Sequence, residues 1–197
     1  GEKPNQLGAV REGMVLRIPI LEPEVKPAGQ SFQFPLDVTE TSYFKFGDLY
    51  PPSSKWAGKP HPGVDFHQRE GAPVYAIGEG IVLVNRNNHD GYGHYIMIEH
   101  TLAGSGNAVF SLYGHLQQDA PNGGGFQSPP VGTRLRGESI QIGLEGQTGN
   151  AGGLSHVHFE IKKTSQLGLY GMINTHNLRD YFYDPYTFIP EQTFLPI

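Results

Sequence analysis

Ser155-His156-Val157-His158-Phe159-Glu160-Ile161 is the stretch that decides how this chain folds. In an extended strand, successive side chains point to opposite faces, so the two histidines and the glutamate share one face and three apolar residues share the other. The apolar face can pack on a core. The two imidazoles lie roughly 6.6 Å apart along the strand, so both can serve one metal site, one as a ligand and the other beside it. The alternative is a strand whose polar side chains face solvent.

Composition narrows the class of protein. The 197 residues suffice for one sizeable domain with a short appendage. Glycine (27) and proline (16) are abundant and only 17% of residues are charged, which favours short strands joined by turns. The net charge of -5 and the lack of a basic tract argue against nucleic acid and anionic membranes as partners. No apolar run is long enough for a membrane span. With no cysteine, a transition metal must be held by His, Asp or Glu.

The pattern of apolar runs and turns predicts an all-β, antiparallel, sandwich-like domain. Strands are expected at residues 72–77, 80–84, 94–100, 109–113, 139–143 and 155–161. Residues 85–93 and 117–133 read as polar or Pro/Gly-rich loops, and no helical period appears between residues 31 and 161. The aromatic and Pro-rich C-terminal tail, from residue 165, is expected to lie over the domain with a short helical turn near residues 177–182.

The first 30 residues differ from the rest. Pro19, Pro23 and Pro27 indicate an extended N-terminal arm or linker, with the main domain at residues 31–197. Residues 13–19 resemble the last strand of a LysM carbohydrate-binding module, but over only a fraction of its length, and we favour an arm that packs on the main domain. Because the sequence begins with Gly1, we expect any export signal to lie upstream of it.

Three separated pieces of sequence carry candidate chemistry. His61 and Asp65 flank a Pro-Gly turn, where they can converge on one point or simply cap the turn; His115 follows a predicted strand; and His156 and His158 share a strand face. Two histidines and one carboxylate leave a fourth tetrahedral position for water, which is the layout of a catalytic zinc site. The two remaining histidines can then act on that water and on a scissile carbonyl.

The chain resembles the lysostaphin-type, LytM-like zinc endopeptidases that cut bacterial peptidoglycan. The similar segments occur in the family's order over roughly residues 44–161. They are His61-Pro62-Gly63-Val64-Asp65, Gly71-Ala72-Pro73-Val74-Tyr75-Ala76, Gly91-Tyr92-Gly93, Ser111-Leu112-Tyr113-Gly114-His115-Leu116, Ile142-Gly143, Gly146-Gln147-Thr148-Gly149 and His156-Val157-His158-Phe159-Glu160-Ile161.

The resemblance implies a role for each of the five positions. His61, Asp65 and His158 match the ligands of one Zn²⁺ per chain, and His115 and His156 match the two catalytic histidines that do not bind metal. It also implies an antiparallel β fold with a groove floored by the sheet and walled by loops. The implied substrate is a peptide bond in peptidoglycan cross-links or stem peptides, and the implied location is the cell envelope, periplasmic or secreted.

Several alternatives stay open from the sequence. The chain can be a catalytically silent cell-wall-binding or activator module of the same fold, or a different metal hydrolase on a β scaffold. We assign the general base to His156 and oxyanion or leaving-group chemistry to His115, although the two roles are exchangeable. Glu160 is either a hydrogen-bond partner of a ligand imidazole or an exposed strand carboxylate. The family's site tyrosine is Tyr43 or Tyr50. The other histidines are expected to be structural or to lie on the surface: His67, His89, His94, His100 and His176.

Overall fold

The computed structural model describes residues 31–37, 43–88, 91–119, 125–137 and 139–193. The predicted N-terminal arm, residues 1–30, lies outside these ranges, so its boundary and its likeness to LysM stay predictions.

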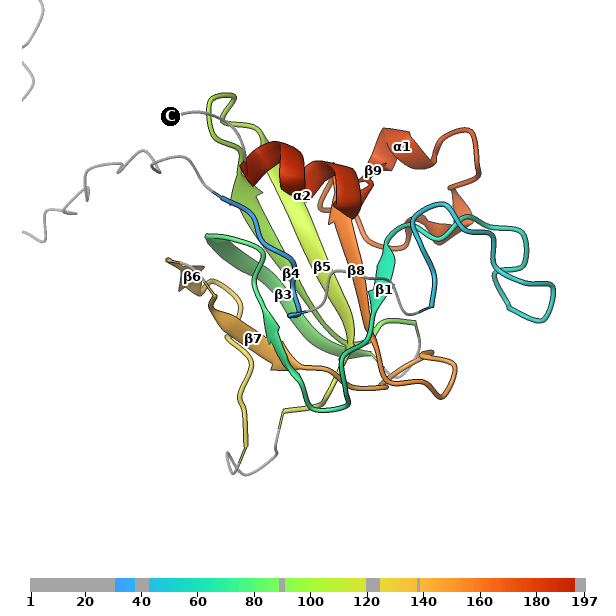
Figure 1. Cartoon of the computed structure of the whole chain (residues 1–197), viewed down its shortest axis with the longest axis horizontal. Helices are drawn as coiled ribbons and strands as arrows, with labels where there is room; N and C mark the ends of the chain where they lie inside the picture. Colours follow the sequence, from blue (N-terminus) through green and yellow to red (C-terminus); the bar gives the residue numbers. More distant parts are fainter. Residues whose placement is uncertain (1–30, 38–42, 89–90, 120–124, 138, 194–197) are drawn as a thin grey trace, which may run out of the picture.

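Antiparallel strands form the body of the molecule (Figure 1), as the sequence predicts. The seven-stranded sheet has the order β1-β8-β5-β4-β3-β6, with β9 also pairing with β8, and β2 and β7 form a separate two-stranded sheet. The strands are β1 Val64–Phe66, β2 Pro73–Tyr75, β3 Gly80–Asn88, β4 Gly93–Thr101, β5 Ala108–Leu116, β6 Arg134–Leu135, β7 Gln141–Leu144, β8 Val157–Lys162 and β9 Phe182–Tyr183.

Strand β8 is the stretch from which the sequence analysis began, and it lies inside the sheet between β1 and β5. Its apolar residues Val157, Phe159 and Ile161 belong to the main hydrophobic core, as alternation predicts. All six residues of the strand are buried. The alternative of polar side chains facing solvent is therefore wrong, and the polar face of β8 must find partners within the protein.

One difference from the predicted strands has a physical cause. The predicted loop at residues 85–93 is wrong in its first half, because β3 continues to Asn88 and pairs with β4. The amide of Asn85 has partners inside the fold, where it donates to the Pro129 carbonyl (3.1 Å) and its Oδ1 lies 3.0 Å from His94 Nε2. Strand β2 pairs with β7 and not with its neighbour in sequence, β3.

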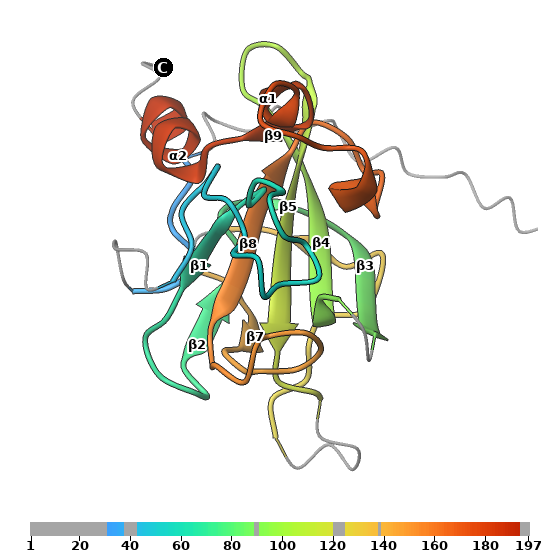
Figure 2. The same cartoon turned by 90° about the vertical axis from the view of Figure 1, so that its right-hand side faces the viewer.

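Helices in the described part of the chain are short and come after β8. They are the 3₁₀ helix η1 Leu169–Gly171, α1 Leu178–Tyr181 and α2 Pro185–Thr193. The predicted helical turn corresponds to α1, whereas α2 was not predicted because Pro190 lies inside it. Phe188 and Ile189 of α2 are buried in the main core, where their burial offsets the missing hydrogen bond. Figures 1 and 2 both show α2 at one end of the strands.

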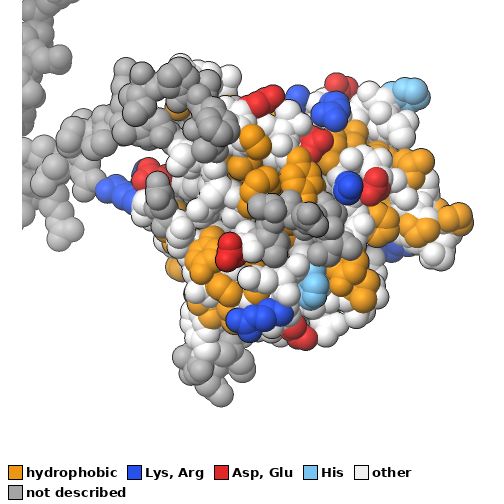
Figure 3. Space-filling view, in the orientation of Figure 1, with side chains coloured by type: hydrophobic (Ala, Val, Ile, Leu, Met, Phe, Trp, Pro, Cys, Tyr) orange, Lys and Arg blue, Asp and Glu red, His pale blue; other side chains and the backbone are white. Residues whose placement is uncertain are grey.

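The described surface carries no dominant charge on the face that Figure 3 shows, where acidic and basic side chains are interspersed. Among the residues that the structure describes, none of the helices has the length and apolar character needed to cross a bilayer.

His100 and Ser111 form a buried polar pair between β4 and β5. His100 Nδ1 donates to the Glu79 carbonyl (2.6 Å), its Nε2 lies 2.7 Å from Ser111 Oγ, and the ring edge packs against Phe32. Burial lowers the pKa of His100 from 6.5 to about 4, although the bond to Glu79 opposes the shift. This histidine is structural, as expected.

His100 should make the protein sensitive to acid. The pKa of His100 is lower in the folded protein than in the unfolded chain. The stability that depends on a neutral His100 is therefore fully present above about pH 6.5 and is lost as the pH falls toward about 4. We expect this to remove on the order of 3 kcal/mol from the free energy of unfolding. Urea unfolding of wild type and His100→Gln between about pH 7 and pH 4 measures it. Parallel pH profiles of the two proteins would contradict the prediction.

Gly63 is required where the chain passes closest to β8. A Cβ at this position would lie 2.1 Å from the Phe159 carbonyl oxygen, a backbone atom that cannot move aside alone. Gly171 is a matched control, because a Cβ there meets nothing within 4 Å. We expect Gly63→Ala to lower the free energy of unfolding by about 2–3 kcal/mol and Gly171→Ala to leave it nearly unchanged. Denaturant titration of the two variants measures these free energies. Equal unfolding midpoints would contradict the prediction, because they would show that the close approach of residue 63 to β8 tolerates a Cβ.

Candidate metal centre

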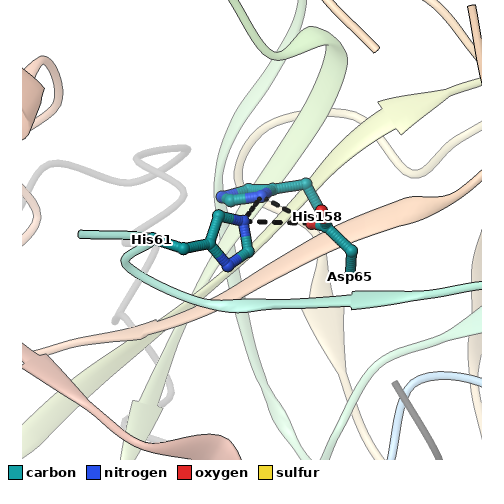
Figure 4. A group of neighbouring side chains, drawn as sticks. All are labelled: His61, Asp65 and His158. Carbon is teal, nitrogen blue, oxygen red and sulfur yellow. Dashed lines mark hydrogen bonds and ion pairs between the residues drawn. The ribbon is translucent and has the colours of Figure 1, made fainter. Parts of the chain in front are cut away.

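Three side chains from two parts of the sequence converge within the sheet. His61 lies just before β1, Asp65 lies in β1, and His158 lies in β8 directly opposite Asp65 in the strand register. His61 Nε2 lies 2.9 Å from His158 Nδ1 and 3.1 Å from Asp65 Oδ1, and His158 Nδ1 lies 3.0 Å from the same oxygen. Figure 4 shows these three contacts as a closed triangle. All three residues are buried.

The outer nitrogens of the two imidazoles fix which atoms face inward. His61 Nδ1 donates to the Gly63 carbonyl (2.8 Å), and His158 Nε2 donates to Glu160 Oε1 (2.9 Å). In the neutral rings, this leaves the lone pairs of His61 Nε2 and His158 Nδ1 pointing at each other and at the Asp65 carboxylate. With both rings neutral, three buried acceptors at this separation repel one another unless they share a cation, which is either a proton on His158 or a metal ion.

The donor set and its electrostatics fit a zinc ion. Zinc–ligand distances near 2.0–2.2 Å place neighbouring atoms of a tetrahedral site roughly 3.3 Å apart, close to the observed 2.9–3.1 Å. Burial raises the pKa of Asp65, but the charges and hydrogen bonds of His61 and His158 outweigh it and hold that pKa well below its usual range. Burial lowers the pKa of His158, yet its bonds to Asp65 and Glu160 raise it to about 9. The site therefore favours positive charge.

His115 and His156 lie beside this triangle. Their ring centroids are 4.7 Å apart, and His156 Nε2 lies 3.8 Å from Asp65 Oδ1. His115 Nδ1 donates to the Thr148 carbonyl (2.8 Å) and His156 Nδ1 donates to the Leu154 carbonyl (3.0 Å). In the neutral rings each Nε2 is thus an unprotonated base.

Burial keeps both of these imidazoles neutral at neutral pH. It lowers the pKa of His115 to about 3, with a further contribution from the neighbouring His156 and His158. Burial also lowers the pKa of His156, although the Asp65 carboxylate opposes the shift. A neutral imidazole has an Nε2 lone pair that can accept a proton, which is the first requirement of a general base.

The backbone at His115 adopts a conformation that the sequence does not reveal. Its φ angle is 61°, in the left-handed region that residues with a side chain rarely occupy. The residue stands at the end of β5, and its N–H donates to the Tyr92 carbonyl (2.7 Å). Such strain persists only where surrounding contacts impose it, and it is concentrated at functional sites.

Glu160 is a partner of a site imidazole and not an exposed carboxylate, so the first of the two sequence interpretations holds. The residue is fully buried, and its Oε1 accepts from both His158 Nε2 and the Tyr92 hydroxyl (2.7 Å). Burial raises the pKa of Glu160, but Lys162 and the bonds from His158 and Tyr92 bring it down to about 2. The carboxylate is therefore charged.

The two candidate tyrosines occupy different sides of the centre. Tyr43 packs edge-on against the His156 ring, with centroids 5.4 Å apart, and is 37% exposed. Tyr50 packs against His61, and its hydroxyl lies 3.3 Å from the hydroxyl of Tyr170. The loop that carries both tyrosines crosses in front of β8 in Figure 2. Tyr43 is thus the one with a surface beside His156, and Tyr50 is engaged within the protein.

Sequence reasoning missed Tyr170 and Glu145. The Tyr170 hydroxyl lies 3.4 Å from His158 Nε2, and its ring packs on Trp56. Glu145 is fully buried; it accepts from the Ser155 hydroxyl (2.7 Å) and from backbone N–H groups of the turn after β1, and it contacts His67 Nδ1 (2.6 Å). Glu145 thereby ties that turn to the residue before His156. Neither contact has a local sequence signal.

The other histidines that the structure describes lie outside the centre. His94 and His100 share β4 but have separate partners within the fold. His67 contacts Glu145, and His176 is exposed. His89 lies outside the described residues.

Comparison with known proteins agrees with this geometry. The peptidoglycan DD-endopeptidases ShyA and ShyB of Vibrio cholerae serotype O1 are 36% and 38% identical to this chain over 113 and 103 residues. These matches cover 57% and 52% of the chain but only 22% and 20% of the two relatives, so the chain spans about a fifth of their length.

Solved structures show the same fold. A zinc containing peptidase from Vibrio cholerae is 28% identical with a TM-score of 0.51, over 66% of this chain and 36% of that one. The catalytic domain of lysostaphin from Staphylococcus simulans is 23% identical with a TM-score of 0.54, over 75% of this chain and 90% of that domain.

The match to a family covers more than half of the sequence. Residues 59–168 correspond to Peptidase family M23, and this range includes all five histidine and aspartate positions of the centre. With its antiparallel sheet and its buried His-Asp-His triangle, the chain belongs to peptidase family M23.

Proposed function

We propose that this chain is a zinc-dependent endopeptidase that hydrolyses peptide bonds in bacterial peptidoglycan, in a cross-link or in a stem peptide. The observation that carries the proposal is the pairing of the buried acceptor triangle with two neutral imidazoles, one of which lies 3.8 Å from the triangle's carboxylate. The named activity of ShyA and ShyB supports peptidoglycan as the substrate. A peptidoglycan substrate implies a location outside the cytoplasm.

Each site residue has a distinct role in this proposal. His61 Nε2, Asp65 Oδ1 and His158 Nδ1 hold the metal, one per chain. Bound zinc lowers the pKa of a coordinated water and polarises the substrate carbonyl. His156 accepts the proton of the attacking water through Nε2, since its Nδ1 proton is held by the Leu154 carbonyl.

His115 completes the proton transfer. Its Nδ1 proton is held by the Thr148 carbonyl, and its ring faces that of His156. Once its Nε2 carries the proton that His156 accepted from water, His115 can stabilise the oxyanion or deliver that proton to the leaving amine. Tyr43 packs against His156 and is 37% exposed, so it is the tyrosine that can reach a substrate on this side of the centre.

Purified protein should release peptides from isolated peptidoglycan. We expect a chelator to abolish release and added zinc to restore it, because the proposed reaction depends on a metal held by three protein ligands with a fourth position open. Mass analysis of products from defined muropeptides identifies the bond that is cut. Tight binding to the cell wall without any cleavage at saturating zinc would instead support a silent binding module, and cleavage of unrelated substrates alone would support a different hydrolase.

Metal ligands and proton-transfer groups should fail differently when replaced. Because His158→Ala removes a ligand, both bound zinc and activity should be lost. Because His156→Ala leaves all three ligands in place, zinc should stay while the rate falls by about 10²–10⁴-fold. His61→Ala and Asp65→Ala should behave like the first variant, and His115→Ala like the second.

Bound zinc by elemental analysis and cleavage of a defined muropeptide are measured together for this set. His156 and His158 make the sharpest pair, because they lie two residues apart and both approach Asp65. Loss of zinc in His156→Ala with retention in His158→Ala would reverse the ligand assignment on this strand.

A further inference from the structure

Lys162 is a buried lysine next to the centre, and nothing in the proposed chemistry uses it. It is the last residue of β8 and is 0% exposed. Its Nζ lies 3.5 Å from Glu160 Oε2 and 4.6 Å from the centroid of the Phe182 ring. Removing an ammonium from water costs several kcal/mol, so the position needs a physical reason.

Stability alone is a weak reason for this pair. A buried ion pair is often no more stable than well-packed apolar residues of similar volume. The pair also stands in a row with a ligand, because His158, Glu160 and Lys162 alternate along β8 and contact one another in turn. Lys162 is therefore connected to the metal centre through Glu160.

The two oxygens of the Glu160 carboxylate have different partners. Oε1 accepts from His158 Nε2 and from the Tyr92 hydroxyl, while Oε2 faces Lys162. The first contact keeps the proton of His158 on Nε2 and leaves Nδ1 directed at Asp65. Lys162 Nζ is the cation that faces the other oxygen of this carboxylate, so the lysine contacts the group that holds the His158 ring in place.

We propose that Lys162 is a positioning residue of the metal centre: its ammonium balances the Glu160 carboxylate, which orients His158 and strengthens its hold on the metal. The inference rests on the proposed zinc site. Hydrogen-bond partners of metal-binding imidazoles typically contribute 10- to 100-fold in metal affinity. Lys162 acts one step further out, so its contribution should pass entirely through Glu160.

Lys162→Met and Lys163→Met form a matched pair to test this. Lys163 is the next residue, is exposed, and donates to the Arg179 carbonyl (2.7 Å) away from Glu160. Zinc dissociation constants are measured by competition with a chromogenic chelator at a temperature where all variants are folded. We expect Lys162→Met to weaken zinc binding by about 10-fold and Lys163→Met to leave it within about twofold of wild type.

A double-mutant cycle tests the route through Glu160. Since Glu160→Gln removes the charge that Lys162 balances, adding Lys162→Met to it should cost no further zinc affinity. Additive losses would overturn the proposal, as would a Lys162→Met protein that is less stable yet binds zinc like wild type. Lys162→Gln, which keeps a donor but no charge, replaces the methionine variant if that variant does not fold. Wild type failing to bind zinc would instead refute the metal site itself.

Discussion

The mutual repulsion of three buried acceptors is the constraint on which the rest of this structure depends. His61 Nε2, Asp65 Oδ1 and His158 Nδ1 lie about 3 Å apart, and when both imidazoles are neutral none of these atoms is a donor, so the site binds either a proton on His158 or a metal ion. The fold must hold them there against that repulsion until a cation is shared. It does so with the pairing of β1 and β8, which sets Asp65 opposite His158, and with outer hydrogen bonds that fix each imidazole.

Strand β8 unites packing and chemistry because its two faces have separate tasks. One face carries Val157, Phe159 and Ile161 into the core, and the other carries the ligand, its carboxylate partner and the lysine. A slip of one residue in register would exchange the two faces completely. The core therefore specifies the site: the apolar residues that stabilise the sheet also determine which way every polar residue of β8 points.

The alternation that places these faces is local, which is why sequence could predict it, along with the antiparallel class. The convergence of His61, Asp65 and His158 was implied by the resemblance to a family and not by any local pattern. Contacts between segments that are distant in the sequence could not be predicted from local patterns. Lys162 and Glu160 alternate as charged residues do on an exposed strand, and only the sheet's neighbours make them buried. Helix α2 was missed because Pro190 argues against it locally, whereas Phe188 and Ile189 stabilise it through the core. Tyr170 follows the last recognisable motif and meets His158 only through the path of the tail.

The segments that flank the family-matched residues 59–168 close the back of the centre. Tyr50 comes from before this range and Tyr170 from after it, and their hydroxyls meet beside His158. Lys59 adds to this closure by donating to the carbonyls of Gly171 (3.4 Å) and Ile173 (3.0 Å). Water excluded from the outer edge of His158 cannot compete for its bond to Glu160, and that bond is stronger in a low-dielectric setting. Residues on both sides of the family-matched range thus add contacts beside His158 to those that Glu160 makes within it.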